Sequence, residues 1–232
     1  RKNAEALTEY EAVLATPWND FSEISARRAA TIAMDLRKYE QAYKIFTAMR
    51  NNSTDEYANE TIYRGLMKSG FMLGKQDEAG RYADSLLAMG GVSSEAATDA
   101  KYVKARSLQL SDRDNEAIEA FKQLAGNKSG EIAAESRYRI AEILLKQDKL
   151  KEAEEAANET VKLSAGNDNW VGKAYILLAD VLLKQKDYFN AKALLQSIVK
   201  NTKVQELKVE AAKKLDEAKK AEKSSSKLSD EK

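Results

Sequence analysis

Small and apolar residues recur along this chain with two periods at once. Within each predicted helix they follow three- and four-residue steps, as Tyr138, Ala141, Leu144 and Leu145 do, which is the spacing of an amphipathic helix. On a longer scale, alanines return at intervals of 36, 37, 38, 36 and 38 residues. These alanines are Ala6, Ala42, Ala79, Ala117, Ala153 and Ala191. A period of this size predicts a solenoid of repeated helical units.

A second row of mostly small residues precedes five of these alanines by 12 positions each time. Its members are Ala30, Met67, Ala105, Ala141 and Ala179. The constant offset predicts two helices per unit, A and B, joined by a short turn. Small residues at the crossing let the two helix axes approach to about 8–10 Å. We therefore expect the two rows to meet where helix A crosses helix B.

The pattern predicts an all-α chain, a right-handed α-solenoid of antiparallel helix pairs with about 12 helices. The repeat array is expected at 1–201, followed by a C-terminal capping helix at 202–222 and a polar, disordered tail at 223–232. Within the array we expect a half unit at 1–17 and full units at 20–50, 54–88, 94–125, 130–163 and 168–201. The half unit matches helix B alone, which indicates an array cut from a longer one or a single unpaired helix by design.

Composition narrows the classes of function. The 232 residues carry a net charge of +1, so no global field favours nucleic acid or an anionic membrane. The chain contains no cysteine and no histidine, the residues that most often supply nucleophiles, general bases and zinc ligands. Acidic pairs are frequent but lie among lysines, as is usual on a solvated helix face. We expect no enzyme activity, no catalytic residue, no metal and no cofactor.

The repeats resemble the tetratricopeptide repeat (TPR) family. The segment Tyr39-x2-Ala42-x3-Phe46 matches that family's aromatic, alanine and phenylalanine spacing, and Leu178-Ala179 resembles its leucine-glycine pair. The resemblance covers residues 2–201. The period of 36–38 residues is longer than the family's 34, and Pro17 is the only closing proline. Extended, proline-poor repeats of this kind look like divergent bacterial arrays, which would place the chain in the periplasm or cell envelope, although the sequence itself fixes no compartment.

The resemblance implies that ligands lie in a concave groove lined by the A helices. The positions of this chain that match are Arg27, Thr31, Arg64, Lys68, Phe71, Tyr102, Arg106, Tyr138 and Glu142. The same stripe continues to Ile176, Asp180 and Leu183. Its first part is basic and its last part acidic, a combination that suits an extended peptide with carboxylates. The alternative is an ordinary solvated helix face.

A solenoid usually works by holding other molecules. The sequence thus predicts a protein-interaction scaffold that binds a peptide segment or partner protein in the helix-A groove. One alternative is a structural arm that associates with itself through apolar surface around Tyr10 and Val13. Another is RNA binding by a related class of helical repeats, which would favour a continuous basic groove. The partner itself is not named by the sequence, and we expect no nucleic acid and no membrane span.

Overall fold

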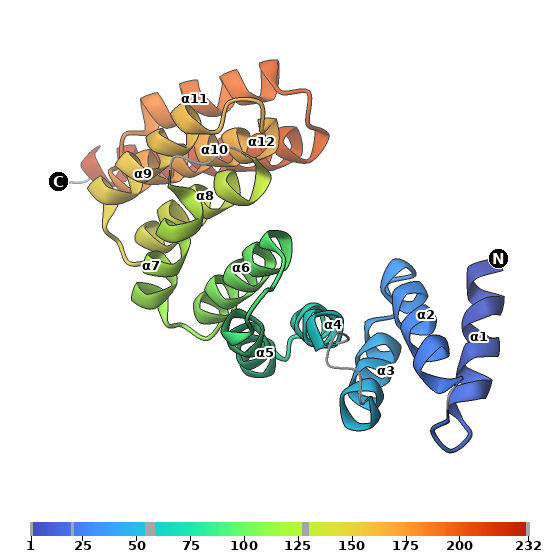
Figure 1. The fold of residues 1–232 in the computed structure, drawn as a ribbon. Helices are drawn as coiled ribbons and strands as arrows, with labels where there is room; N and C mark the ends of the chain where they lie inside the picture. The colour runs from blue at the N-terminus through green and yellow to red at the C-terminus, as the bar shows by residue number, and fades with distance from the viewer. Residues whose placement is uncertain (1, 20, 54–58, 127–129, 231–232) are drawn as a thin grey trace. The chain divides into compact units, whose positions relative to one another are not determined.

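The computed structural model describes residues 2–19, 21–53, 59–126 and 130–230, and within these ranges it contains twelve α-helices and no strand (Figure 1). The helices are α1 (Lys2–Leu14), α2 (Ser22–Asp35), α3 (Tyr39–Asn52), α4 (Asn59–Met72), α5 (Gln76–Ala88), α6 (Ser94–Leu110), α7 (Asp114–Ala125), α8 (Glu131–Lys146), α9 (Leu150–Leu163), α10 (Asp168–Lys184), α11 (Tyr188–Asn201) and α12 (Gln205–Asp230). The predicted all-α class and the number of helices are confirmed.

The chain forms two compact units, Arg1–Ala120 and Phe121–Lys232, which we call unit 1 and unit 2. The even-numbered helices correspond to the predicted A helices and the odd-numbered ones to the B helices. In unit 1 each helix from α1 to α6 packs against the next, and in unit 2 the same holds from α8 to α12. Successive A helices also touch, α4 with α6 in unit 1 and α8 with α10 in unit 2. This nearest-neighbour packing is that of an α-solenoid.

The two rows of small residues lie in the core. In helix A, the fully buried members are Ala30, Met67, Ala105, Ala141 and Ala179. In helix B, they are Ala42, Ala79, Ala117, Ala153 and Ala191. All ten have a relative exposure of 0%, as expected for positions where two helices cross closely.

Ala6, the first alanine of the series, is an exception because it is only half-buried. Its neighbour Leu7 takes the core position in α1, with a relative exposure of 1%. Helix α1 packs mainly against α2, and Gln41 of α3 also donates a hydrogen bond to Glu11 of α1 at 2.9 Å. In this packing Leu7 rather than Ala6 faces the core. The prediction that Ala6 occupies the core position of α1 is therefore wrong by one residue.

Five A helices end in the same turn. One residue in each turn has a positive φ: Arg37, Gly74, Asp112, Asp148 and Lys186, five residues before the helix-B alanine in every case. The N–H of the following residue donates to the carbonyl five positions earlier, for example Lys149 to Leu144 at 3.0 Å and Asp187 to Leu182 at 2.9 Å. This bonding satisfies the last carbonyls of the helix and turns the chain into helix B.

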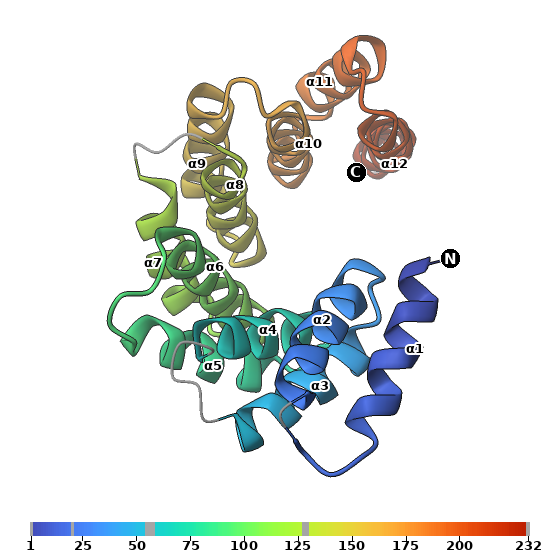
Figure 2. The ribbon, with the colours of Figure 1, turned by 45° about the vertical axis from the view of Figure 1, so that its right-hand side comes forward.

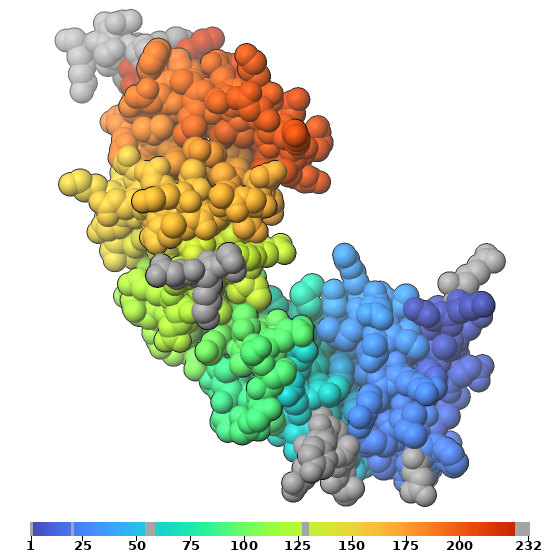
Figure 3. All heavy atoms as spheres, turned by 45° about the horizontal axis from the view of Figure 1, so that its top comes forward, coloured from blue at the N-terminus to red at the C-terminus, as the bar shows by residue number. Residues whose placement is uncertain are grey.

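Helix α12 lies beside α10 and α11, and Figure 2 shows these three at the end of unit 2. In the space-filling view the atoms of α10 to α12, coloured yellow-orange to red, form one continuous mass (Figure 3). The buried face of α12 contains Leu207, Ala211 and Ala218.

Helix α12 runs to Asp230, whereas the sequence predicted a helix ending at 222 and a disordered tail from 223. Residues 223–230 contain four serines and no glutamate, so helix propensity alone does not account for this extension. The Ser224 hydroxyl donates to the Lys220 carbonyl at 3.0 Å. Residues 231–232 lie outside the described ranges, and the other predicted boundaries stay predictions.

Candidate interaction surface

The nine residues predicted to line a groove lie on four A helices. Arg27 and Thr31 are exposed on α2, whereas the other seven are half-buried on α4, α6 and α8. The Thr31 hydroxyl donates to the Arg27 carbonyl at 3.0 Å, so these two form one exposed patch. The Arg27 side chain is 48% exposed and lies 3.4 Å from Glu23 one turn earlier. We call the exposed and half-exposed side chains of the A helices the A-helix surface.

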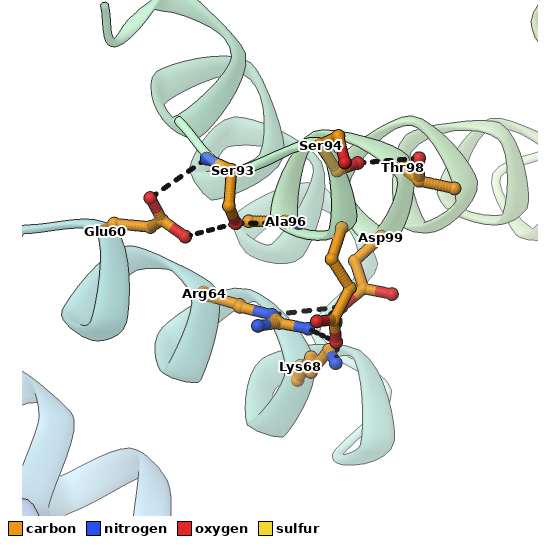
Figure 4. A network of polar contacts seen from close by, with 9 residues as sticks. Glu60, Arg64, Lys68, Ser93, Ser94, Ala96, Thr98 and Asp99 are labelled. Atoms are coloured by element: carbon orange, nitrogen blue, oxygen red, sulfur yellow. Dashed lines mark hydrogen bonds and ion pairs between the residues drawn. The ribbon is translucent and has the colours of Figure 1, made fainter. Parts of the chain in front are cut away.

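Arg64 and Lys68 of α4 converge on one carboxylate of α6, as Figure 4 shows. Arg64 donates to Asp99 Oδ2 from Nε at 3.0 Å and from Nη2 at 2.6 Å. The Lys68 ammonium lies 2.5 Å from the same oxygen. Glu95, one turn before Asp99, accepts another hydrogen bond from Arg64. The two cations are therefore neutralised by the next repeat.

Burial of Arg64 opposes its charge, but hydrogen bonds to Glu95 and Asp99 outweigh this and raise the Arg64 pKa above its ordinary value. Asp99 was not among the predicted residues. It follows Arg64 by 35 positions, about one repeat, and this separation is the sequence signal that could have found it. Phe71, further along α4, packs against the same unit's core as a half-buried side chain.

The start of α6 is also held by α4. Glu60 accepts hydrogen bonds from the Ser93 N–H at 3.1 Å and from its hydroxyl at 2.6 Å (Figure 4). Ser93 in turn caps α6 by accepting from the Ala96 N–H at 3.3 Å. The hydrogen bonds from Ser93 lower the pKa of Glu60 below its ordinary value. The carboxylate thus supports the cap only while it is ionised.

Tyr102 and Arg106 complete the predicted residues of unit 1, both half-buried on α6. Tyr102 packs against the core of this part of unit 1. Arg106 donates from Nη1 to Gln109 one turn later, which keeps its guanidinium close to its own helix.

In unit 2 an aromatic cluster lies between α8 and α10, next to the A-helix surface. The rings of Tyr138 on α8 and Trp170 on α10 lie 5.5 Å apart at 41°. Arg139 lies over both rings, at 5.6 Å from Tyr138 and 5.5 Å from Trp170, and Lys173 lies 4.6 Å from the Trp170 ring. Cations at this distance are attracted to the ring faces. Trp170, Arg139 and Lys173 were missed because the predicted stripe followed single positions of each repeat.

Carboxylates surround this cluster. Arg139 makes ion pairs with Glu135 and Glu142, each at 2.9 Å. The Tyr138 hydroxyl donates to Glu142 at 3.3 Å, and burial together with the Glu142 charge raises the pKa of Tyr138 above its ordinary value. Tyr138 and Glu142 were both predicted and are brought together here. The cluster joins a half-buried tyrosine and a buried tryptophan to charges of both signs.

The last part of the predicted stripe is not on the surface. Ile176 is 2% exposed and packs with Leu183 against Leu207 of α12. Asp180 is half-buried and accepts two hydrogen bonds from Lys214, at 2.7 and 2.9 Å. Burial raises the pKa of Asp180, although the Lys214 charge acts in the opposite direction. Because α12 covers this side of α10, the predicted acidic end is used for packing.

Polar contacts one repeat apart recur along both units. Besides Arg64–Asp99 and Lys214–Asp180, they include Lys184–Asp148 at 2.7 Å on the A-helix side and the hydroxyl of Tyr43 bonding to Glu78 on the B helices. Arg50 likewise donates to the Tyr82 hydroxyl at 2.8 Å. These bonds tie neighbouring repeats together within each unit.

Tyr10 and Val13, expected to form an open apolar patch, are half-buried. The Tyr10 hydroxyl accepts a hydrogen bond from Arg28 at 3.2 Å, so its polar end is satisfied within unit 1. Among the described residues there is no group of three or more acidic side chains placed to hold a metal ion. None of the described helices combines the length and apolar character that crossing a membrane requires.

Comparison with known proteins identifies solved structures with a similar fold. No protein-family model and no curated protein matches this sequence. Solved structures do match. The C-terminal part of a TPR repeat-containing protein from Cytophaga hutchinsonii is 14% identical with a TM-score of 0.66, covering 95% of this chain and 89% of that one. The apo form of RapI is 13% identical with a TM-score of 0.65, covering 76% and 69%.

A third structure is YrrB, described as a TPR protein with an unusual peptide-binding site. It is 15% identical with a TM-score of 0.55, and the match covers 82% of this chain and 91% of that one. At these sequence identities, the similarity shows a shared arrangement of helices and nothing about function.

Proposed function

We propose that this chain, which has the fold of a TPR-type array, acts as a protein-interaction scaffold that binds a partner polypeptide on its A-helix surface. The observation that carries the proposal is the set of bonds from Arg64 and Lys68 to Asp99. They hold neighbouring A helices in fixed register, so the half-exposed side chains beside them are pre-organised. A surface whose side chains are already held loses less entropy on binding a partner.

The chemistry of this surface suits a polypeptide. Tyr138 and the neighbouring cations offer aromatic area together with donors for carboxylates or backbone carbonyls, and aromatic and arginine side chains are those enriched at protein interfaces. Arg27, which is exposed next to Thr31, adds a cationic side chain to this surface in unit 1. YrrB, which shares the fold, is described as having a peptide-binding site, and this supports the same class of ligand here.

The RNA-binding alternative is disfavoured by the same geometry. RNA recognition needs side chains whose positive charge remains available to phosphates. Arg64 and Lys68 are instead compensated by Asp99 and Glu95, and Arg139 by two glutamates. The self-association alternative depends on Tyr10 and Val13, whose half-buried state leaves little apolar area for a second copy.

The test is a charge reversal that leaves the fold intact. Arg64 is unsuitable, because its removal would leave Asp99 without its main partner. Arg27→Glu is better, since its side chain is 48% exposed and its ion pair with Glu23, one turn earlier, is long at 3.4 Å. Lys44→Glu is the matched control, because Lys44 is exposed on helix B (α3) and carries the same charge.

Partners are captured with the wild type from a lysate of the source organism, identified, purified and titrated against all three proteins. We expect Arg27→Glu to weaken the affinity about fivefold or more, in line with the loss of one charge-assisted hydrogen bond. Lys44→Glu should bind as the wild type does. Equal affinity for Arg27→Glu and wild type, or a larger loss with Lys44→Glu, would remove the A-helix surface as the site.

A further inference from the structure

Two large apolar side chains are exposed together at the start of α2. Phe21, the residue before the helix, is 75% exposed, and Ile24 in the first turn is 58% exposed. Phe21 already has helical backbone angles, with φ −85° and ψ −18°, so these two residues, three positions apart, lie on one side of the helix. Among the described residues, no other two exposed large apolar side chains lie three or four positions apart. Single exposed apolar residues are common, whereas a pair that forms one patch indicates an interaction surface.

Other repeats show what covers the position of Phe21. Phe21 lies nine positions before Ala30, the buried residue at which α2 crosses helix B. Ala96 of α6 and Trp170 of α10 lie nine positions before the equivalent residues of their helices, and they are 0% and 7% exposed. Ala96 belongs to a core cluster shared by α4, α5 and α6, and Trp170 packs on Tyr138 of α8. This position therefore faces the preceding A helix.

The position of Ile24 faces the same way. Ile24 lies six positions before Ala30, and its equivalent in α6 is Asp99. Asp99 accepts hydrogen bonds from Arg64 of α4 at 3.0 and 2.6 Å and lies 2.5 Å from the Lys68 ammonium. The two residues of α4 that reach it are four positions apart, one turn of a helix. An A helix thus contacts the next one through a pair of side chains spaced i, i+4.

Helix α2 has no such neighbour among the described residues. No A helix precedes it there, and α1 is the helix beside it at this end of unit 1 (Figure 1). Phe21 and Ile24 are therefore exposed at positions that another A helix covers in α6 and α10. Because an α-helix fills this place in those repeats, an α-helix is also the shape that fits beside α2.

The apolar pair defines part of the chemistry of the occupant. In α6 the Asp99 carboxylate receives two cations, whereas α2 has Phe21 and Ile24 on this face. A charge buried against two apolar side chains would lose its hydration without gaining a partner. An occupying helix therefore needs apolar side chains at the two positions, four apart, that are cationic in α4.

A cation next to the pair defines the rest. Arg28, one turn after Ile24, is exposed, and its guanidinium donates to the Tyr10 hydroxyl at 3.2 Å. Tyr10 is neutral, and Arg28 makes no ion pair with a described residue, so its charge favours a carboxylate on the occupant. A second copy of this chain would present the same pair, with Arg28 in place of that carboxylate.

We propose that Phe21, Ile24 and Arg28, which we call the α2 patch, bind an amphipathic α-helix of a partner protein. The helix packs beside α2 as α4 packs beside α6. It carries two apolar side chains four positions apart, which contact Phe21 and Ile24, and a carboxylate one turn later, which pairs with Arg28. The carboxylate comes after the pair because successive A helices run in the same direction, as the contacts Glu60–Ser93 and Lys68–Asp99 show.

The α2 patch is distinct from the stripe predicted from the sequence. Arg27 and Thr31 occupy the repeat positions of Arg64 and Lys68, whose side chains reach the following A helix. The α2 patch lies at positions that face the preceding one. The proposal therefore does not depend on a ligand at the stripe.

The probe is a synthetic peptide that copies an A helix of this chain. It has the sequence of α8, Glu131–Lys146, with Glu142→Leu and Lys146→Glu, so that Tyr138 and the introduced leucine form the apolar pair and a carboxylate follows one turn later. The control peptide has Glu142→Leu alone and keeps the lysine. Both are titrated into the full chain by calorimetry at constant ionic strength. We expect saturable one-site binding of the probe and binding of the control peptide that is at least about threefold weaker.

Variants of the protein locate the site. Phe21→Ser and Ile24→Ser should each weaken binding of the probe about tenfold, because each removes one large apolar side chain from the contact. Both side chains are exposed, so thermal melts should show an intact fold. Met72→Ser is the matched control, because Met72 is 53% exposed on α4 and lies outside the α2 patch. Arg28→Gln should remove the preference for the probe over the control peptide.

Four results would overturn the proposal. The first is the absence of saturation with the probe up to about 1 mM, which is already a weak affinity. The second is an equal loss of affinity in Met72→Ser and Phe21→Ser. The third is equal affinity of the wild type for the two peptides. The fourth is a wild type that sediments as a dimer while Phe21→Ser is a monomer, because the α2 patch would then bind a second copy.

Discussion

The ring of Phe46 lies directly against the backbone of Gly65. A Cβ built at Gly65 would be 2.2 Å from Phe46 Cζ, far inside van der Waals contact. Phe46 follows the buried Ala42 by one turn of α3 and is 5% exposed, so its ring is held between α3 and α4. Gly65 is buried in the middle of α4. The contact between α3 and α4, which joins two successive repeats, therefore requires a glycine.

Gly65→Ala should destabilise the protein by about 2–3 kcal/mol, because overpacking a close contact outweighs the helix propensity that alanine adds. Gly80→Ala is the control, since its Cβ would be at an ordinary 3.8 Å from Ser107, and it should be neutral or stabilising by up to about 1 kcal/mol. Urea unfolding measures both. Adding Phe46→Leu to Gly65→Ala should recover part of the loss, and a double variant that is strictly additive would contradict this explanation.

The sequence predicted the core well because helix crossings impose a size limit on one position per helix. Ala30 and Ala42 are examples: each lies where two helix axes approach, and both are fully buried. The same reasoning failed at Ala6, because Leu7 and not Ala6 faces the core of unit 1. It also did not predict α12 beyond residue 222, since a run of Ser and Lys is typical of a polar tail and is a weak helix signal.

The candidate surface was predicted less well, and the reason lies in long-range pairing. Arg64 and Lys68 were identified as basic positions, but their partner Asp99 comes from the next repeat. Trp170, at the centre of the aromatic cluster in unit 2, occupies a different repeat position from Tyr138 and was therefore not on the stripe. Looking for oppositely charged residues about one repeat apart in the sequence, rather than within single helices, would have found the Arg64–Asp99 contact.

Replacing non-glycine residues that have a positive φ in the turns between helices A and B should stabilise the protein. Arg37 and Lys186 have φ angles of 57° and 63°, a left-handed conformation that costs a residue with a Cβ about 1 kcal/mol or more. The equivalent position of another repeat is Gly74, with a φ of 76°. Arg37→Gly and Lys186→Gly should each raise the free energy of unfolding by about 0.5–1 kcal/mol, after the extra entropy of the unfolded glycine is subtracted.

Chemical denaturation of the two glycine variants and of Gly74→Ala measures this effect. Gly74→Ala should lower the free energy of unfolding by about 1 kcal/mol, since nothing lies within 4 Å of its Cβ and only the backbone conformation opposes it. Destabilisation by Lys186→Gly together with no effect of Gly74→Ala would mean that the turn conformation does not limit stability.

Arg137 of unit 2 is buried, with a relative exposure of 3%, and fastens the ends of two B helices. It donates to the carbonyls of Ala125 at 2.9 Å and Gly126 at 2.8 Å, and to the Leu163 carbonyl at 3.3 Å. A cation at helix C-termini is stabilised by the partial negative charge of the last carbonyls. A charged residue on an A helix looks like a surface residue in sequence, so this role could not be predicted.

Arg137→Met should lower the free energy of unfolding by about 2–4 kcal/mol, because it keeps most of the volume but leaves buried carbonyls without donors. Arg137→Lys should lose less, since it retains the charge but not the branched set of donors. Arg113→Gln serves as the comparison, because that side chain is 57% exposed and pairs with an exposed Glu116. If thermal and urea unfolding show the same small loss for Arg137→Met and Arg113→Gln, the buried arginine does not hold these helix ends.

The cap of α6 gives a pH dependence whose sign follows from the contact between Glu60 and Ser93. Hydrogen bonds from Ser93 lower the pKa of Glu60 below the value of 4.5 for a free carboxyl. The stabilisation is therefore fully present above about pH 4.5 and is lost as the pH falls through the lower pKa of the folded protein. Glu60→Gln keeps an oxygen acceptor but does not titrate. The Tm difference between wild type and Glu60→Gln should thus favour the wild type at neutral pH and shrink in acid.

Thermal melts across this range, recorded by circular dichroism, measure that difference. Glu155→Gln is the control, because Glu155 is exposed in the middle of α9, away from both helix ends, and makes no hydrogen bond with a described residue, so the comparison isolates the effect of the Ser93 contact. A wild-type advantage over Glu60→Gln that grows on acidification would reverse the sign expected from a lowered pKa. A difference that is constant for both variants would mean that the Ser93 bonds do not favour the ionised carboxylate.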